Sequence, residues 1–233
     1  MDRATWDRRA PFAGACFAVL AAICYFLLPT AMPPKASDGG DKYVSYISMH
    51  HTALLWHGYL TGIAFVFFVW FVAAVAHRLE GLGESRLAAT MYAGGLIVAG
   101  IALLQASIMT WLAWDHGGGL DGSMVKALIN VPAFAFAFPW AVFVGASAIA
   151  SWRAKMLPEY LNMFGVLLAV WILVSGATFA HSGFFSPGGW FGGIAVIAFL
   201  VGTFVASCWL TLHPEGMPAH EPRMAHHSPA MHL

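Results

Sequence analysis

The chain has 233 residues, of which 60% are hydrophobic and 9% are charged, and its mean hydropathy is +0.72. A soluble domain carries about 25% charged residues, so this composition excludes an ordinary soluble fold. The formal net charge is zero, which leaves no basic surface for nucleic acid.

Six apolar stretches follow one another along the chain, and each is long enough to cross a bilayer as an α-helix. About 20 residues span the hydrocarbon core. The first stretch follows Arg3, Arg8 and Arg9, as in a signal peptide. Its apolar run of about 20 residues exceeds the usual 7–15 of such peptides, so we expect a retained helix. The stretches cover residues 12–32, 52–75, 88–114, 128–151, 160–180 and 189–212.

The connections between these stretches are short, which predicts an all-α, up-and-down bundle of six transmembrane helices over residues 1–212. Residues 33–51 form the longest connection. Within it, residues 43–51 are expected to form a short interfacial helix that leads into the second span. Most of the chain is thus expected to lie in the lipid bilayer, and no separate soluble domain is expected.

The basic residues predict which way the bundle is inserted, because Lys and Arg are enriched on the cytoplasmic side of short loops. With the N-terminus inside, eight basic residues lie inside and three lie outside. We therefore expect both termini in the cytoplasm and a multi-pass protein of the inner (plasma) membrane. The inner set is Arg3, Arg8, Arg9, Arg78, Arg86, Arg153, Lys155 and Arg223, and the outer set is Lys35, Lys42 and Lys126.

Several histidines fall at the outer ends of three different spans in this topology. Neutral imidazole is a common ligand of transition metals, including Zn and Cu. The sequence therefore predicts an outer metal site made by His57, Asp115, His116 and His181. His50 and His51 would lie in a surrounding layer that orients these ligands.

Two alternatives belong to other functional classes. Axial imidazoles from two helices can hold a b-type haem, and His57 with His181 would be the pair in a membrane redox subunit. Pro132 and Pro139 break the hydrogen-bond ladder of the fourth span, as in transporters that hinge around a cavity. The second alternative requires a cavity at these prolines.

Three side-chain amides lie in or near the spans. They belong to Gln105, Asn130 and Asn162. Amides within a membrane commonly bond across helices, so interhelical hydrogen bonds are expected for all three.

Residues 213–233 differ in composition from the rest of the chain. They contain five His, three Met and four Pro but few aliphatic residues, which predicts a disordered cytoplasmic tail. Thioether and imidazole groups favour soft or borderline ions such as Cu(I), Ni or Zn, so the tail is a second candidate for metal binding.

Three short motifs resemble a loose group of bacterial polytopic membrane proteins of unassigned function. They are Trp-Asp-Arg-Arg-Ala-Pro at 6–11, His-Arg-Leu-Glu at 77–80 and Leu-Pro-Glu-Tyr-Leu at 157–161. The resemblance implies a polytopic helical protein and brings no catalytic residues. We therefore interpret the chain as a non-enzymatic membrane component, an accessory or metal-handling subunit that has other membrane subunits as candidate partners.

A peptide of residues 213–233 is expected to bind Cu(I), Ni or Zn, measured by titration of the metal into the peptide. Affinity should fall below about pH 6, because imidazoles with an ordinary pKa of about 6.5 then gain protons and stop being ligands. A scrambled peptide without His is the control. Equal affinity of the two peptides would contradict the prediction.

Overall fold

The computed structural model describes residues 9–26, 34–35, 37–115, 119–176, 184 and 190–213. Within this part of the chain every regular element is a helix, as predicted. In chain order the elements are the 3-10 turn η1 (Ala10–Phe12) and the helices α2 (Ala13–Phe26), α3 (Gly40–Gly81), α4 (Ser85–Trp114), α5 (Gly122–Arg153), α6 (Glu159–Gly176) and α7 (Trp190–Leu212).

Five of these helices, α3 to α7, are long and apolar enough to cross a membrane. The chain is therefore a multi-pass helical membrane protein. Helix α2 is apolar but holds 14 residues, a rise of about 21 Å at 1.5 Å per residue. A hydrocarbon core is about 30 Å thick. Residues 27–32 of the predicted first span lie outside the described part, so the sixth crossing stays a prediction.

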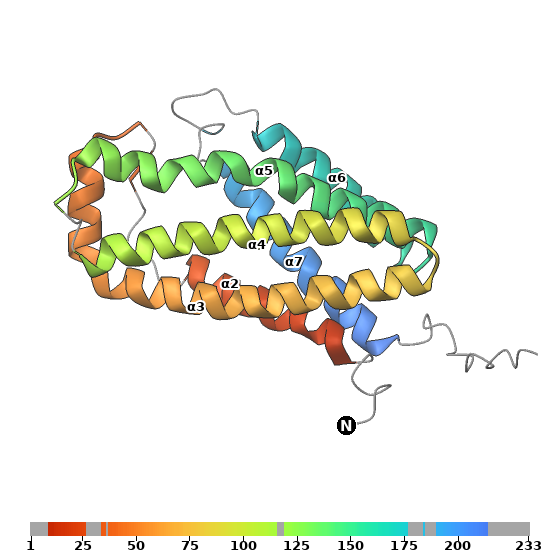
Figure 1. Cartoon of the computed structure of the whole chain (residues 1–233). Coiled ribbons are helices and arrows are strands. Elements are labelled where there is room, and N and C mark those ends of the chain that lie inside the picture. Colours follow the sequence, from red (N-terminus) through yellow and green to blue (C-terminus); the bar gives the residue numbers. More distant parts are fainter. Residues whose placement is uncertain are drawn as a thin grey trace, which may run out of the picture.

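Consecutive helices are antiparallel neighbours, as their short connections predicted (Figure 1). Each of α3, α4, α5 and α6 packs against the next helix in the chain, and α2 packs against both α3 and α7. The contact between α2 and α7 brings the first and last helices together. As a result, the described chain begins and ends at the same end of the bundle, which we call the proximal end, and the opposite end is the distal end.

A hydroxyl group fastens α7 to the start of α2 at the proximal end. Ser207 is fully buried. Its Oγ accepts a hydrogen bond from the Ala15 amide at 2.9 Å and donates one to the Pro11 carbonyl. The first turn of a helix has no partners of its own for its amides. Ser207 therefore caps α2 from another helix.

Two arginines join further helix ends at the proximal end. Arg78, near the end of α3, donates from Nη1 to the Leu210 carbonyl of α7 at 2.8 Å. Arg153 closes α5 and forms an ion pair with Glu84, in the turn between α3 and α4, at 3.0 Å. A cation near the last carbonyls of a helix also interacts favourably with the helix dipole. The proximal end is thus held by contacts between elements distant in sequence.

Aromatic rings form the centre of the main core. Phe68 of α3 is fully buried. Its ring centroid lies 4.8 Å from that of Phe17 in α2 and 5.3 Å from that of Phe143 in α5. Trp140 of α5 meets Phe199 of α7 edge to face at 5.2 Å. Such pairs contribute about 0.5–1.5 kcal/mol each beyond their burial, and they connect four helices.

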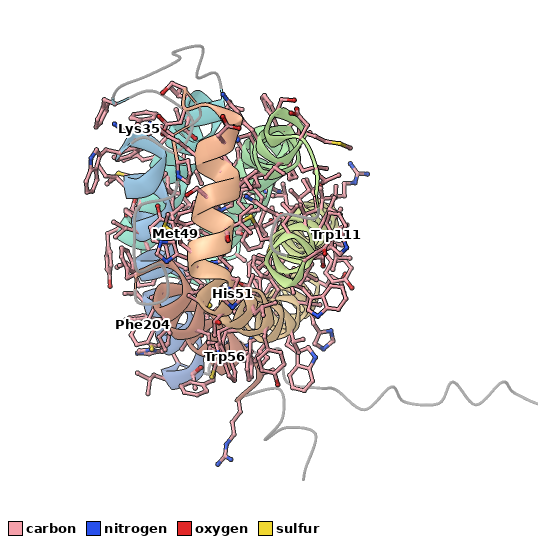
Figure 2. The ribbon with its side chains drawn as sticks, turned by 90° about the vertical axis from the view of Figure 1, so that its left-hand side faces the viewer. Lys35, Met49, His51, Trp56, Trp111 and Phe204 are labelled. Carbon is pink, nitrogen blue, oxygen red and sulfur yellow. The ribbon has the colours of Figure 1, made fainter. Side chains whose placement is uncertain are left out.

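A second, smaller core lies at the distal end, and we call it the distal cap. Helix α3 breaks at His50, where φ is −116° and ψ is 18°. The preceding segment, residues 40–49, crosses the end of the bundle (Figures 1 and 2). This confirms the predicted short helix before the second span. The buried residues of the distal cap are Tyr43, Ile47, Leu54, Leu112, Ala113 and Val125.

Polar contacts fix the crossing segment to the start of α5. Asn130 donates from Nδ2 to the Tyr43 hydroxyl at 3.2 Å. That hydroxyl donates to the Lys35 carbonyl at 3.0 Å. Lys126 donates from Nζ to the Asp38 carbonyl at 2.8 Å. The interhelical bond predicted for Asn130 is therefore confirmed.

The first residues of α3 and α5 touch through their backbones. A Cβ added to Gly122 would lie 2.6 Å from the carbonyl carbon of Gly40. Real Cβ atoms do not approach backbone so closely, and backbone cannot move away as a side chain can. Glycine at both positions is what allows the distal cap to close.

Charge placement bears on the orientation of the bundle. Five described basic residues lie at the proximal end and three at the distal end, in line with the sequence count. Arg3, Arg8 and Arg223 lie outside the described part. The proximal set is Arg9, Arg78, Arg86, Arg153 and Lys155, and the distal set is Lys35, Lys42 and Lys126.

Cysteine labelling in whole cells checks which end faces the cytoplasm. In a background in which Cys16, Cys24 and Cys208 are replaced by Ala, an impermeant thiol reagent is expected to label Ser37→Cys and to spare Ser85→Cys, because Lys and Arg collect at the proximal end. Permeabilised cells, in which both positions react, serve as the control. The reverse labelling pattern would show that the orientation is wrong.

Replacing the buried hydroxyl that caps α2 should loosen the proximal end. Ser207→Ala leaves the Ala15 amide and the Pro11 carbonyl without their partner, which costs about 1–3 kcal/mol. The midpoint of thermal or denaturant unfolding in detergent should fall accordingly. Ser107→Ala removes an exposed hydroxyl that bonds only within α4 and should change little. Equal stability of the two variants would contradict the capping role.

Candidate functional site

The predicted outer histidines lie at the distal end of α3. His50 occupies the break in the helix, and its ring lies 4.9 Å from that of Tyr46. His51 follows directly, with Nδ1 3.2 Å from the Ser48 carbonyl. Figure 2 shows His51 beside the crossing segment, where the chain turns into the long part of α3. Both imidazoles thus contact neighbouring residues of their own helix.

His57 lies two turns further along α3 and is half-buried. Its Nδ1 is buried and has no hydrogen-bond partner. Asp115 lies at the end of α4 and is exposed. Among the described residues, no three His, Cys, Asp or Glu side chains are grouped closely enough to hold a metal ion. His116 and His181 lie outside the described part, so the complete predicted set stays a prediction, as does the haem pair.

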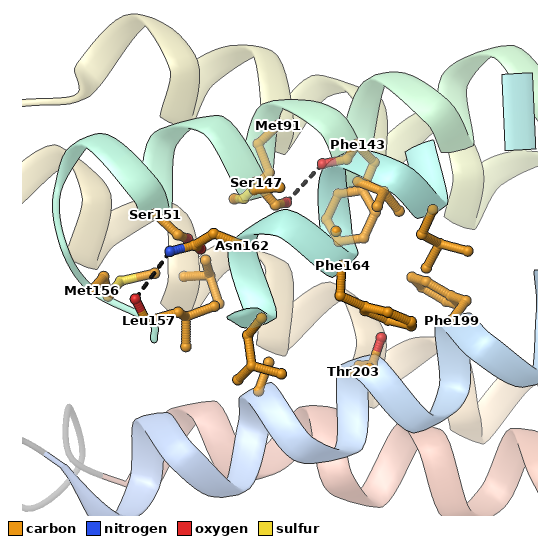
Figure 3. A pocket seen from close by; sticks show the side chains of 18 of the residues that line it. Met91, Phe143, Ser147, Ser151, Met156, Leu157, Asn162, Phe164, Phe199 and Thr203 are labelled. Carbon is orange, nitrogen blue, oxygen red and sulfur yellow. Dashed lines mark hydrogen bonds between the residues drawn. The ribbon is translucent and has the colours of Figure 1, made fainter. Parts of the chain in front are cut away.

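The described helices line a cavity of about 100 Å³ nearer the proximal end (Figure 3). Five helices contribute to it, and most of its wall is apolar. Sequence reasoning did not find it. The lining residues are Phe71, Val75, Met91, Phe143, Val144, Ser147, Ala148, Ser151, Met156, Leu157, Leu161, Asn162, Phe164, Gly165, Leu168, Phe199, Gly202, Thr203, Ala206 and Leu210.

Asn162 is the most polar group in this wall. It lies on the first turn of α6 and is 1% exposed. Its Nδ2 donates to the Leu157 carbonyl in the preceding turn at 2.9 Å. The expected interhelical bond is therefore wrong for this residue, because the amide closes the start of its own helix. The Leu157 carbonyl is an acceptor, so it faces the Nδ2 group of the amide. The Oδ1 atom, which is also an acceptor, therefore points away from Leu157. It is buried without a partner.

Three hydroxyl groups complete the polar part of the wall. Ser147 of α5 donates to the Phe143 carbonyl of its own helix at 2.6 Å. Ser151 of α5 and Thr203 of α7 are buried. Figure 3 shows Ser151 and Asn162 on one side of the cavity, with Phe164, Phe199 and Thr203 further along it. The Asn162 amide and the Ser151 hydroxyl thus lie at the proximal part of the cavity, and Thr203 is a polar group further along its mostly apolar wall.

The prolines of α5 lie apart from this cavity. Helix α5 runs through both Pro132 and Pro139, and neither lines the cavity. The carbonyl of Pro139 instead lies 3.2 Å from where a Cβ on Gly94 would be. Glycine there lets α4 approach α5, so a packing role accounts for the geometry at Pro139.

Comparison of the chain with protein-family models, with curated proteins and with solved structures finds no match. The resemblance noted in three short motifs therefore gives no family assignment. What supports a function is the chemistry of the described residues.

Proposed function

We propose that this chain is a non-enzymatic membrane component that binds a small, largely apolar molecule carrying one hydrogen-bond donor. The observation that carries this proposal is the Oδ1 atom of Asn162, which is buried without a partner in the wall of a largely apolar cavity. Ligand sites are commonly apolar clefts in which a few polar groups fix the orientation.

The lining supports binding rather than catalysis. Among the described residues that line the cavity there is no Asp, Glu, His, Cys, Lys or Arg. A Ser or Thr hydroxyl needs an adjacent base to act as a nucleophile. The absence of a cation also selects against an anionic head group, because a buried charge without a partner is costly. A neutral ligand is therefore favoured.

The unpaired amide oxygen determines how strongly a ligand with a hydroxyl group should be preferred over one with a methyl group. A buried acceptor without a donor costs about 1–3 kcal/mol, which a ligand hydroxyl would recover. Each 1.4 kcal/mol corresponds to a factor of about ten in affinity. A ligand with a hydroxyl should therefore bind about tenfold more tightly than an equally large ligand with a methyl group in its place.

A matched pair of probes tests this expectation with the full chain in lipid nanodiscs. 6-Fluorohexan-1-ol and 1-fluoroheptane differ only by hydroxyl against methyl, and ¹⁹F NMR reports their bound fractions. Partition into lipid is the same for every variant, so it cancels when variants are compared. The roughly tenfold preference for the alcohol should be present in the wild type and lost in Asn162→Leu.

Two further variants complete the test. Ala206→Leu fills the cavity and leaves the Asn162 amide intact, so it should weaken both probes. Asn130→Leu makes the same substitution at the distal end and should retain the preference for the alcohol. If the wild type and Asn162→Leu show the same preference, the cavity does not bind through this amide and the proposal fails.

A second candidate function is metal binding at the distal end, and the unpartnered Nδ1 of His57 supports it. We propose that His57, Asp115, His116 and His181 are the ligands of a Cu or Zn ion, with His50 and His51 around them. The tail would collect the ion on the other side of the membrane. Asp and His together suit borderline ions of this kind.

Elemental analysis of the full chain purified without an affinity tag tests the metal site. About one ion per chain is expected, and His57→Ala should lose it. His77→Ala removes a histidine at the proximal end and should keep it. Protein without a stoichiometric metal after reconstitution with Cu or Zn would contradict the site. A Soret absorbance band would instead favour the haem pair His57 and His181.

A further inference from the structure

We propose that the cavity opens sideways to the bilayer between α6 and α7, with Phe164 as its gate. The ligand is then a neutral membrane amphiphile with a hydroxyl head and a single hydrocarbon chain, which enters from the lipid. This inference rests on the proposed function.

Partly exposed lining residues lie mainly on α6 and α7, and Met156 and Leu157 in the turn before α6 are also partly exposed. The lining residues of α3 and α4, and most of those of α5, are buried. The lining residues on the facing sides of α6 and α7 include several that are partly exposed, namely Leu161, Phe164, Gly165, Gly202 and Ala206. Both helices are candidate membrane spans. The opening between them therefore faces hydrocarbon rather than water.

Phe164 covers this opening. It is 38% exposed, the largest exposure of the lining side chains. A Cβ added to Gly202 of α7 would lie 2.9 Å from the Cε1 atom of the Phe164 ring. The ring thus rests directly on the backbone of α7 and bridges the gap between the two helices (Figure 3). One aromatic side chain with an exposed face can swing outward without moving either helix.

Depth in the membrane matches the polarity of an amphiphile. Asn162 lies three residues after Glu159, where α6 begins, or about 4.5 Å along the axis. Leu168 is six residues further on, about 9 Å deeper. The unpartnered amide of Asn162 is therefore near the proximal end of the bundle. The lining toward the middle of the bundle is largely apolar, with the Ser147 and Thr203 hydroxyls as its polar groups. A lipid in the adjacent leaflet has the same order of head and chain.

Size explains why a chain would pass through the gate. A closed cavity of about 150 Å³ encloses benzene. The cavity described here is about 100 Å³, so it holds the head and the first carbons of an amphiphile. The rest of a longer chain has to leave through the side where the wall is open. That side is the one that Phe164 covers.

Exchange kinetics in nanodiscs test the gate with 6-fluorohexan-1-ol as the probe. Phe164→Ala should speed both entry and exit severalfold, measured by ¹⁹F exchange NMR. Phe204→Ala is the control, since Phe204 is a 42% exposed α7 residue that does not line the cavity. It should leave the rates unchanged.

A photoreactive dodecanol with a diazirine in mid-chain gives a second readout. Its adducts should map to residues 161–168 and 199–206 of the wild-type protein, and Ala206→Leu should remove them. Unchanged exchange rates in Phe164→Ala, or adducts confined to other helices, would overturn the gate while leaving the cavity as a binding site. If the wild-type protein shows no preference for the alcohol over the fluoroalkane, the proposed function and this inference both fail.

Discussion

The need to satisfy every backbone hydrogen bond in hydrocarbon governs this structure. An unpaired N–H or C=O costs several kcal/mol in a bilayer, so a chain with this composition forms helices wherever it crosses. The described chain leaves regular helical geometry toward the ends of the bundle, as at His50 and in the turns. At the start of α2 a side chain replaces the missing backbone partner, because the Ser207 hydroxyl accepts a hydrogen bond from the Ala15 amide.

The helices are joined in different ways at the two ends of the bundle. Long-range polar contacts fasten the proximal end, through Ser207, Arg78 and Arg153. The distal end is closed by a crossing helix over its own small core. Between them, the aromatic core around Phe68 packs α2, α3, α5 and α7 tightly. Helices α5, α6 and α7 are left less closely filled near the proximal end, and the cavity with Asn162 lies there.

The sequence predicts the parts of this fold that depend on local patterns. Uninterrupted apolar runs predict α3 to α7, and the short helix before the second span follows from residues 43–51. The cavity could not be predicted, since Met91, Ser151 and Thr203 come together only when five helices pack. Asn162 was expected to bond across helices, but the turn at Leu157 offers a nearer carbonyl. The outer metal site was predicted only from the position of the histidines at the outer ends of the spans. That position does not determine which side chains face each other.

The ligand proposed for the cavity beside Asn162 is a neutral amphiphile drawn from the bilayer. An experimental structure of the full chain in nanodiscs made with lipids of its host membrane tests this most directly. Elongated density is expected to begin about 3 Å from Oδ1 of Asn162 and to continue past Phe164 between α6 and α7. An empty cavity, or one that holds only water with Phe164 closed over it, would contradict lipid binding at this site.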